Sequence, residues 1–170
     1  MLIREFHADQ WLPRPMDEVF PFFGDAGNLQ QLTPSWLRFK ILTPRPIEMR
    51  PGALIDYRLR VHGFPLRWQS EITAWEPPFR FVDEQRRGPY RLWVHEHSFQ
   101  SIGGGSLCRD AESYAVPFDI LMHRLFVRPD IERIFAFRRC VLAARFGPAP
   151  IANPSHEAAK TAGFFPRLDS

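Results

Sequence analysis

Turn-forming residues recur at short intervals through the middle of this 170-residue chain and restrict the folds open to it. Clusters of glycine and proline mark turns at 51–52, 62–65, 76–78, 87–89 and 103–105. Each interval between them has the length of one β-strand, and strands joined by short turns pair in antiparallel order. The spacing therefore predicts an antiparallel meander.

The predicted strands alternate apolar and polar residues, as expected when one face of a sheet covers a core. Segments 53–61, 66–75, 79–85 and 106–116 each carry such a face. The side chains assigned to the interior of these four segments include Tyr57, Trp68, Phe79, Phe81, Asp83, Gln85 and Tyr114.

Segment 88–99 has the most informative face. Alternation places Trp93, His95, His97 and Phe99 on one side, so two histidines occupy positions where a core would hold leucine. A buried imidazole needs partners for a donor and an acceptor. This face therefore indicates a pocket with polar contacts.

Helices are expected on both sides of the meander. Residues 15–20 are expected to begin a short helix, because a proline and two acids suit its first turn. A second short helix is expected over 24–32. A longer helix runs from about 129 to 146 and ends before Gly147-Pro148. We expect one domain over 1–147 and a mobile tail over 148–170, which is rich in alanine and proline without periodicity.

Composition excludes several classes of function. A net charge of +3 without a basic cluster does not suit a nucleic-acid binder, and no apolar run reaches the roughly 18 residues of a membrane span. No signal-peptide pattern precedes the first strand, so a cytoplasmic location is expected. Cys108 and Cys140 have no metal-ligand spacing, and we expect two reduced, buried thiols.

Six groups of residues between 1 and 146 together resemble a bacterial group of the START/SRPBCC superfamily. They are Asn28-Leu29 through Leu32-Thr33-Pro34, Gly52-x-x-Ile55-x-Tyr57-x-Leu59, Trp68-x-x-x-Ile72-x-x-Trp75, Phe81-x-Asp83-x-Gln85, Gly88-Pro89-Tyr90-x-x-Trp93-x-His95-x-His97-x-Phe99 and Ile134-Phe135-x-x-Arg138. The resemblance implies an α+β helix-grip fold. In that fold a curved antiparallel sheet, here of six or seven strands, wraps around a long C-terminal helix, and two short helices follow the first strand.

The superfamily includes lipid carriers, polyketide cyclases and aromatases, hormone receptors and cochaperones. The resemblance favours binding of a hydrophobic or aromatic small molecule, lipid-like or polyketide-like, in a cavity between sheet and helix. One alternative is a cyclase or dehydratase in which His95 or His97 is the general acid or base and titrates within about one unit of pH 6.5. Another is a cochaperone-like interaction module. The chain lacks Gly-x-Gly-x-x-Gly, so NAD binding of the Rossmann type is rejected and no cofactor is expected.

The candidate ligand-binding residues come from the inward faces and the long helix. They are Tyr57, Trp68, Phe81, Asp83, Gln85, Trp93, His95, His97, Phe99, Tyr114 and Arg138. His-x-His also suits a metal, with His62, His123 or Asp83 as further ligands. We expect no metal, because His62 lies at a turn on the outer face and the ligand set is incomplete.

Arg138 lies within the apolar stripe of the long helix, three residues after Phe135 and four before Leu142. We hypothesise that its guanidinium points into the cavity and pairs with Asp83 as an anchor for an acidic or carbonyl group. In the alternative, its stem packs against the core and its head reaches water at the rim.

Overall fold

The computed structural model of the chain describes residues 1–117 and 122–148, so nearly all of the predicted tail lies outside the described residues. The elements in chain order are β1 (Arg4–Leu12), α1 (Met16–Gly24), η1 (Ala26–Gln30), η2 (Ser35–Leu37), β2 (Lys40–Ile41), β3 (Leu54–Val61), β4 (Phe64–Glu76), β5 (Arg80–Arg87), β6 (Leu92–Ile102), β7 (Gly105–Ala115), η3 (His123–Val127) and α3 (Arg128–Phe146).

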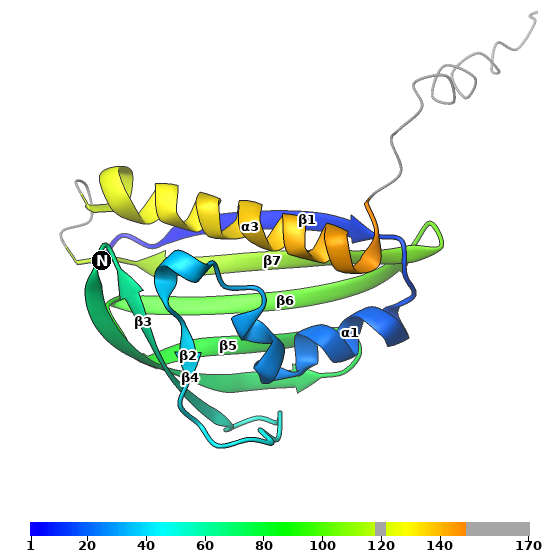
Figure 1. Ribbon diagram of the computed structural model, residues 1–170, viewed down its shortest axis with the longest axis horizontal. Helices are drawn as coiled ribbons and strands as arrows, with labels where there is room; N and C mark the ends of the chain where they lie inside the picture. Colours follow the sequence, from blue (N-terminus) through cyan, green and yellow to red (C-terminus); the bar gives the residue numbers. More distant parts are fainter. Residues whose placement is uncertain (118–121, 149–170) are drawn as a thin grey trace, which may run out of the picture.

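All seven strands form one antiparallel sheet in the order β1-β7-β6-β5-β4-β3-β2, which confirms the predicted meander. Strand β1 pairs with β7 and forms one edge of the sheet, and the short β2 forms the other edge. The two edge strands do not pair with each other, so the sheet is open. In Figure 1 the sheet curves, and α1 and α3 lie on the same face of it. This arrangement confirms the helix-grip fold.

The helix boundaries follow from local chemistry. Helix α1 begins after Pro15 and carries Asp17 and Glu18 in its first turn, where acids favour the positive end of the helix dipole. Helix α3 has a proline in its first turn, follows the π-helical segment η3 and ends before Gly147, whose φ of 102° suits glycine. The second short helix is the 3₁₀ segment η1, and η2 is a further one that the sequence analysis did not separate.

Two inward assignments are corrected by the structure. Phe79 is 60% exposed, because it lies in the turn before β5, where its amide donates to the Glu76 carbonyl, and strand alternation does not reach it. Cys140 lies exposed on α3, whereas Cys108 is buried as expected. Within the described ranges, no helix combines the length and apolar character needed to cross a membrane.

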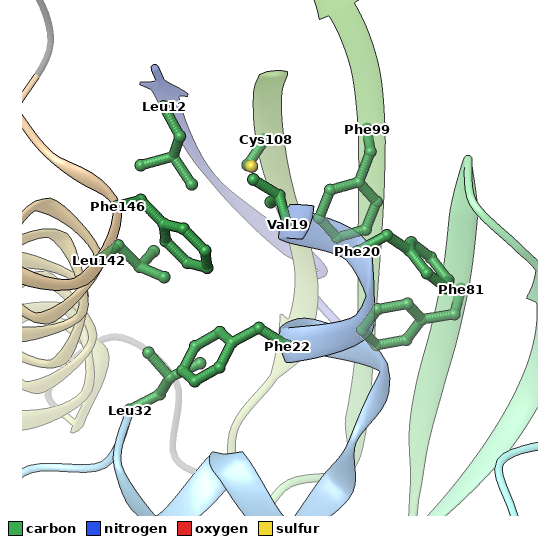
Figure 2. Packing of buried hydrophobic residues seen from close by; sticks show 10 residues of the cluster. All are labelled: Leu12, Val19, Phe20, Phe22, Leu32, Phe81, Phe99, Cys108, Leu142 and Phe146. Atoms are coloured by element: carbon green, nitrogen blue, oxygen red, sulfur yellow. The ribbon is translucent and has the colours of Figure 1, made fainter. Parts of the chain in front are cut away.

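The main apolar cluster joins both helices to one end of the sheet (Figure 2). Phe20 of α1 packs edge-on against Phe99 of β6 with ring centroids 5.3 Å apart, and Phe22 packs against Phe146 of α3 at 5.6 Å. The helix α1 therefore fills the space between sheet and α3 at this end.

Replacing Phe99 by alanine is expected to lower the free energy of unfolding by about 3–5 kcal/mol, because it opens a cavity in this cluster. The matched control is Phe79→Ala, the same substitution at an exposed ring, with an expected change of about 0.5 kcal/mol or less. Urea unfolding measures both. Equal losses in the two variants would contradict the assigned core.

Candidate functional site

A cavity of about 550 Å³ lies between the sheet and α3, a volume typical of small-molecule sites. Its walls come mainly from β3 to β6, the segment before β3 and the inner face of α3. Eight of the eleven predicted ligand-binding residues line it: Tyr57, Trp68, Phe81, Asp83, Trp93, His95, His97 and Arg138. Ligand binding by these residues stays a prediction.

Aromatic rings form one continuous wall of this cavity. Tyr57 stacks on Trp68 with centroids 6.0 Å apart and planes 16° apart, and Trp93 meets Trp68 edge-on at 5.4 Å. Tyr90, at the end of the β5–β6 connection, packs against Trp93 at 4.7 Å. Rings held by other rings present a rigid apolar surface to a ligand.

Three predicted ligand-binding residues do not line the cavity. Gln85 uses its side chain to hold the β5–β6 connection, donating to the Tyr90 carbonyl at 2.7 Å and accepting from the Tyr90 amide at 3.2 Å. Phe99 lies beyond the cavity because α1 covers that part of β6. Tyr114 is fully buried beneath the start of α3, with its hydroxyl 3.0 Å from His123 Nε2.

Acidic and imidazole side chains gather at one wall of the cavity because of strand register. Asp83 of β5 lies opposite His95 of β6, and His95 and His97 lie opposite Glu112 and Asp110 of β7. We call these five residues the polar cluster. Both imidazoles are buried, and their ring centroids are only 3.8 Å apart.

Asp110 lies between the two imidazoles. Its Oδ1 is 3.0 Å from His95 Nε2, with which it forms a hydrogen bond, and 2.8 Å from His97 Nδ1. The contact with His97 is short but does not have the geometry of a hydrogen bond, so Nδ1 of His97 is buried without a hydrogen-bond partner. One carboxylate thus orients both rings.

Asp83 approaches the opposite sides of the same rings. Its Oδ2 lies 3.8 Å from His95 Nδ1 and 3.5 Å from His97 Nε2. Its other oxygen, Oδ1, accepts a hydrogen bond of 3.2 Å from the Ser70 hydroxyl. That hydroxyl is also 3.0 Å from the Tyr57 hydroxyl and accepts from the Trp68 indole, so the aromatic wall and the polar cluster are connected.

The sequence analysis missed Asp110 and Glu112. The signal was present, because alternation from Tyr114 places both acids on the inward face of β7. It was overlooked because only the aromatic residue of that strand was considered.

Burial and the shared carboxylates shift the pKa values of His95 and His97 in opposite directions. Burial, assisted by the charge on His97, lowers the pKa of His95 to about 4. Burial also acts to lower the pKa of His97, but its contacts with Asp110 and Asp83 outweigh that effect and raise it to about 9. Burial alone would raise the pKa of Asp110, yet the imidazoles hold it well below its usual range. Neither pKa lies within about one unit of 6.5, the range expected for a catalytic imidazole, and catalysis by either residue stays a prediction.

Arg138 lines the cavity as hypothesised, but its pairing with Asp83 is wrong. Asp83 contacts Ser70 and the two imidazoles, and no ion pair joins it to Arg138 in the part of the chain that the structure describes. The guanidinium lies instead over the Phe135 ring, 4.9 Å from its centroid, and Nε is buried without a hydrogen-bond partner. Burial raises the pKa of Glu112 to about 8, and the positive charge of Arg138 opposes this rise.

The remaining histidines considered as metal ligands lie elsewhere. His62 has a positive φ of 49° in the turn after β3, so strand alternation does not place it on the outer face. It lines the cavity at the β3–β4 turn and contacts Asp130 of α3 at 2.8 Å. By contrast, Asp83, His95 and His97 each offer one ligand atom, and these atoms lie within 4.8 Å of one another. The expectation that the chain holds no metal stays a prediction.

The chain belongs to the polyketide cyclase/dehydrase and lipid transport family, whose sequence profile matches residues 12–136. No curated protein matches the sequence. Among solved structures it is similar to protein CV1439 from Chromobacterium violaceum, with 15% identity, 86% of this chain and 99% of that chain covered, and a TM-score of 0.66.

Two plant proteins are also similar. The major latex-like protein 151 of Panax ginseng has 13% identity over 87% of this chain and 100% of its own, with a TM-score of 0.64. A point mutant of norcoclaurine synthase from Thalictrum, in complex with a transition-state analogue, has 14% identity over 85% of this chain and 97% of its own, with a TM-score of 0.60. These similarities show a shared fold.

Replacing Asp110 by asparagine is expected to lower the free energy of unfolding by about 3–5 kcal/mol, because it removes the negative charge between two buried imidazoles. Asp9→Asn is the matched control. Asp9 lies on the neighbouring strand in an exposed pair with Arg109, and its loss is expected to change stability by about 1 kcal/mol or less. Guanidinium unfolding at pH 7 compares them, and a small loss in both would contradict the buried network.

Proposed function

We propose that this protein binds a hydrophobic or aromatic small molecule, lipid-like or polyketide-like, with its apolar body against the aromatic wall. The observation that carries the proposal is a cavity of about 550 Å³ that is lined mainly by apolar side chains and has polar groups gathered at one wall. Such a combination is the usual form of a small-molecule site.

Two unsatisfied polar atoms beside the cavity indicate that the ligand also has a polar end. Arg138 Nε and Glu112 Oε2 are buried without hydrogen-bond partners, although both residues line the cavity. Buried polar groups in folded proteins are nearly always paired, and an unpaired one is costly. A ligand hydroxyl would supply both missing partners, since it can accept from Arg138 Nε and donate to Glu112 Oε2, whereas a carbonyl or carboxylate can only accept and would pair with the guanidinium.

Membership of the family supports the same proposal, since its description joins cyclases and dehydrases with lipid transport. Catalysis by His95 or His97 would use the same cavity. We favour binding, because neither imidazole has a pKa near neutrality, where a general base works best. Conversion of the bound molecule into a product would instead show that the protein is an enzyme.

Replacing Trp93 by alanine is expected to weaken binding of the neutral aromatic probe N-phenyl-1-naphthylamine about tenfold. The reason is the loss of one ring face from the aromatic wall, roughly 55 Å² of apolar contact or about 1.4 kcal/mol. Fluorescence titration of the wild-type protein and the variant measures the change.

Trp36→Ala is the matched control for this experiment. Trp36 is 47% exposed, packs against Phe137 and does not line the cavity, so its loss should leave the dissociation constant unchanged. The absence of saturable binding to the wild type, or an equal loss in both variants, would contradict the proposal. Native mass spectrometry of protein purified from its own host would then identify a retained ligand by its mass.

A further inference from the structure

We propose that the polar cluster is a binding site for one divalent transition-metal cation. The ligands are Asp83 Oδ2, His95 Nδ1 and His97 Nε2, and the remaining coordination positions face the cavity. This inference goes beyond the proposed binding of an apolar molecule and does not require it.

The spacing of the three ligand atoms suits a metal better than it suits hydrogen bonds. Asp83 Oδ2 is 3.8 Å from His95 Nδ1 and 3.5 Å from His97 Nε2, and no hydrogen bond joins Asp83 to either ring among the described residues. Distances of this size are long for hydrogen bonds to a carboxylate. Metal bonds of about 2.0–2.2 Å in tetrahedral geometry separate ligand atoms by roughly 3.3–3.5 Å. A contraction of a few tenths of an ångström would bring Asp83 Oδ2 to this spacing from both nitrogens, and all three ligand atoms already lie within 4.8 Å of one another.

The outer contacts of each ligand are those that metal sites use to orient their ligands. Asp110 forms a hydrogen bond of 3.0 Å with the far nitrogen of His95, Nε2, and makes a 2.8 Å ionic contact, without hydrogen-bond geometry, with the far nitrogen of His97, Nδ1. Ser70 donates to the far oxygen of Asp83. A carboxylate behind a ligating imidazole and a hydrogen bond behind a ligating carboxylate both fix the ligand and increase its basicity. The near atoms, one from each of the three residues, lie within 4.8 Å of one another.

Two imidazole nitrogens and one carboxylate oxygen suit a borderline cation such as Zn²⁺ or Fe²⁺. Three protein ligands leave the site open, and the three residues line the cavity. An oxygen atom of a bound molecule could therefore complete the coordination. Glu112 lies beside the site, with Oε1 3.7 Å from His95 Nδ1, and adds a further negative group.

The sequence analysis named Asp83 among the possible further ligands but expected no metal, because the ligand set was incomplete. The structure places Asp83 on β5 directly opposite His95. His62 and His123, the other residues considered, are engaged with Asp130 and Tyr114. The revised ligand set is therefore Asp83, His95 and His97.

The test uses the full chain without an affinity tag, freed of metal by dialysis against a chelator. Titration with Co²⁺, followed by visible absorption, and competition with Zn²⁺ measure affinity, and elemental analysis measures stoichiometry. We expect one ion per chain. His97→Gln and Asp83→Asn are expected to weaken binding by more than about 100-fold, and Ser70→Ala, which removes only an orienting contact, by about 10–100-fold. His7→Gln, at an exposed histidine of β1 that does not line the cavity, is the matched control and should bind metal like the wild type.

Circular dichroism and binding of N-phenyl-1-naphthylamine are measured on every variant. A wild type that folds and binds the probe but takes up no Co²⁺ or Zn²⁺ would overturn the metal site and leave the proposed function standing. A wild type that takes up metal but does not bind the probe would support the metal site and contradict the proposed function. If the ligand variants fail to fold, Ser70→Ala decides. Unchanged metal affinity in that variant, or an equal loss of affinity in His7→Gln, would overturn the assignment.

Discussion

Antiparallel pairing determines which side chains can meet across β5, β6 and β7, because directly opposite residues share one face of the sheet. The observed register sets Asp83 against His95 and His97 against Asp110. A shift of one residue in any of these strands would turn its polar side chain to the other face and leave the rest buried without partners. The polar cluster and the register therefore stabilise one another, and the aromatic wall is attached to both through Ser70.

The same sheet face carries two different environments because the helices cover it unequally. At one end, α1 fills the space between β6 and α3 with Phe20 and Phe22, and the result is an ordinary apolar core. Further along, α3 lies over the sheet with the cavity between them. His97 marks the boundary, since its ring stacks on Phe81 of the apolar core at 4.2 Å and also belongs to the polar cluster.

Alternation and turn spacing were enough to predict the meander, the inward face of β6 and the long helix, because these depend on local periodicity. The cavity's extent could not be predicted in the same way. Phe99 obeys the alternation yet lies outside the cavity, since its environment is set by α1. Arg138 lies on the predicted helix face, but its partner depends on the distance between α3 and the sheet. That distance depends on tertiary packing, which strand alternation and turn spacing do not predict. The hypothesised pair with Asp83 was wrong for this reason.

The polar cluster is built wholly on hydrogen-bonded strands, whereas the β3–β4 turn and the start of α3 meet through His62 and Asp130. Under the proposed function, the contact between turn and helix borders the cavity, whereas most of the polar groups lie on the sheet. Movement of the β3–β4 turn could change what enters without displacing Glu112 or the other groups of the polar cluster, whereas movement of α3 would also displace Arg138. For the same reason, substitutions along β3, or on α3 away from Arg138, could alter the size of the molecule accepted while the polar groups are retained. The fold thereby separates two properties that could evolve independently.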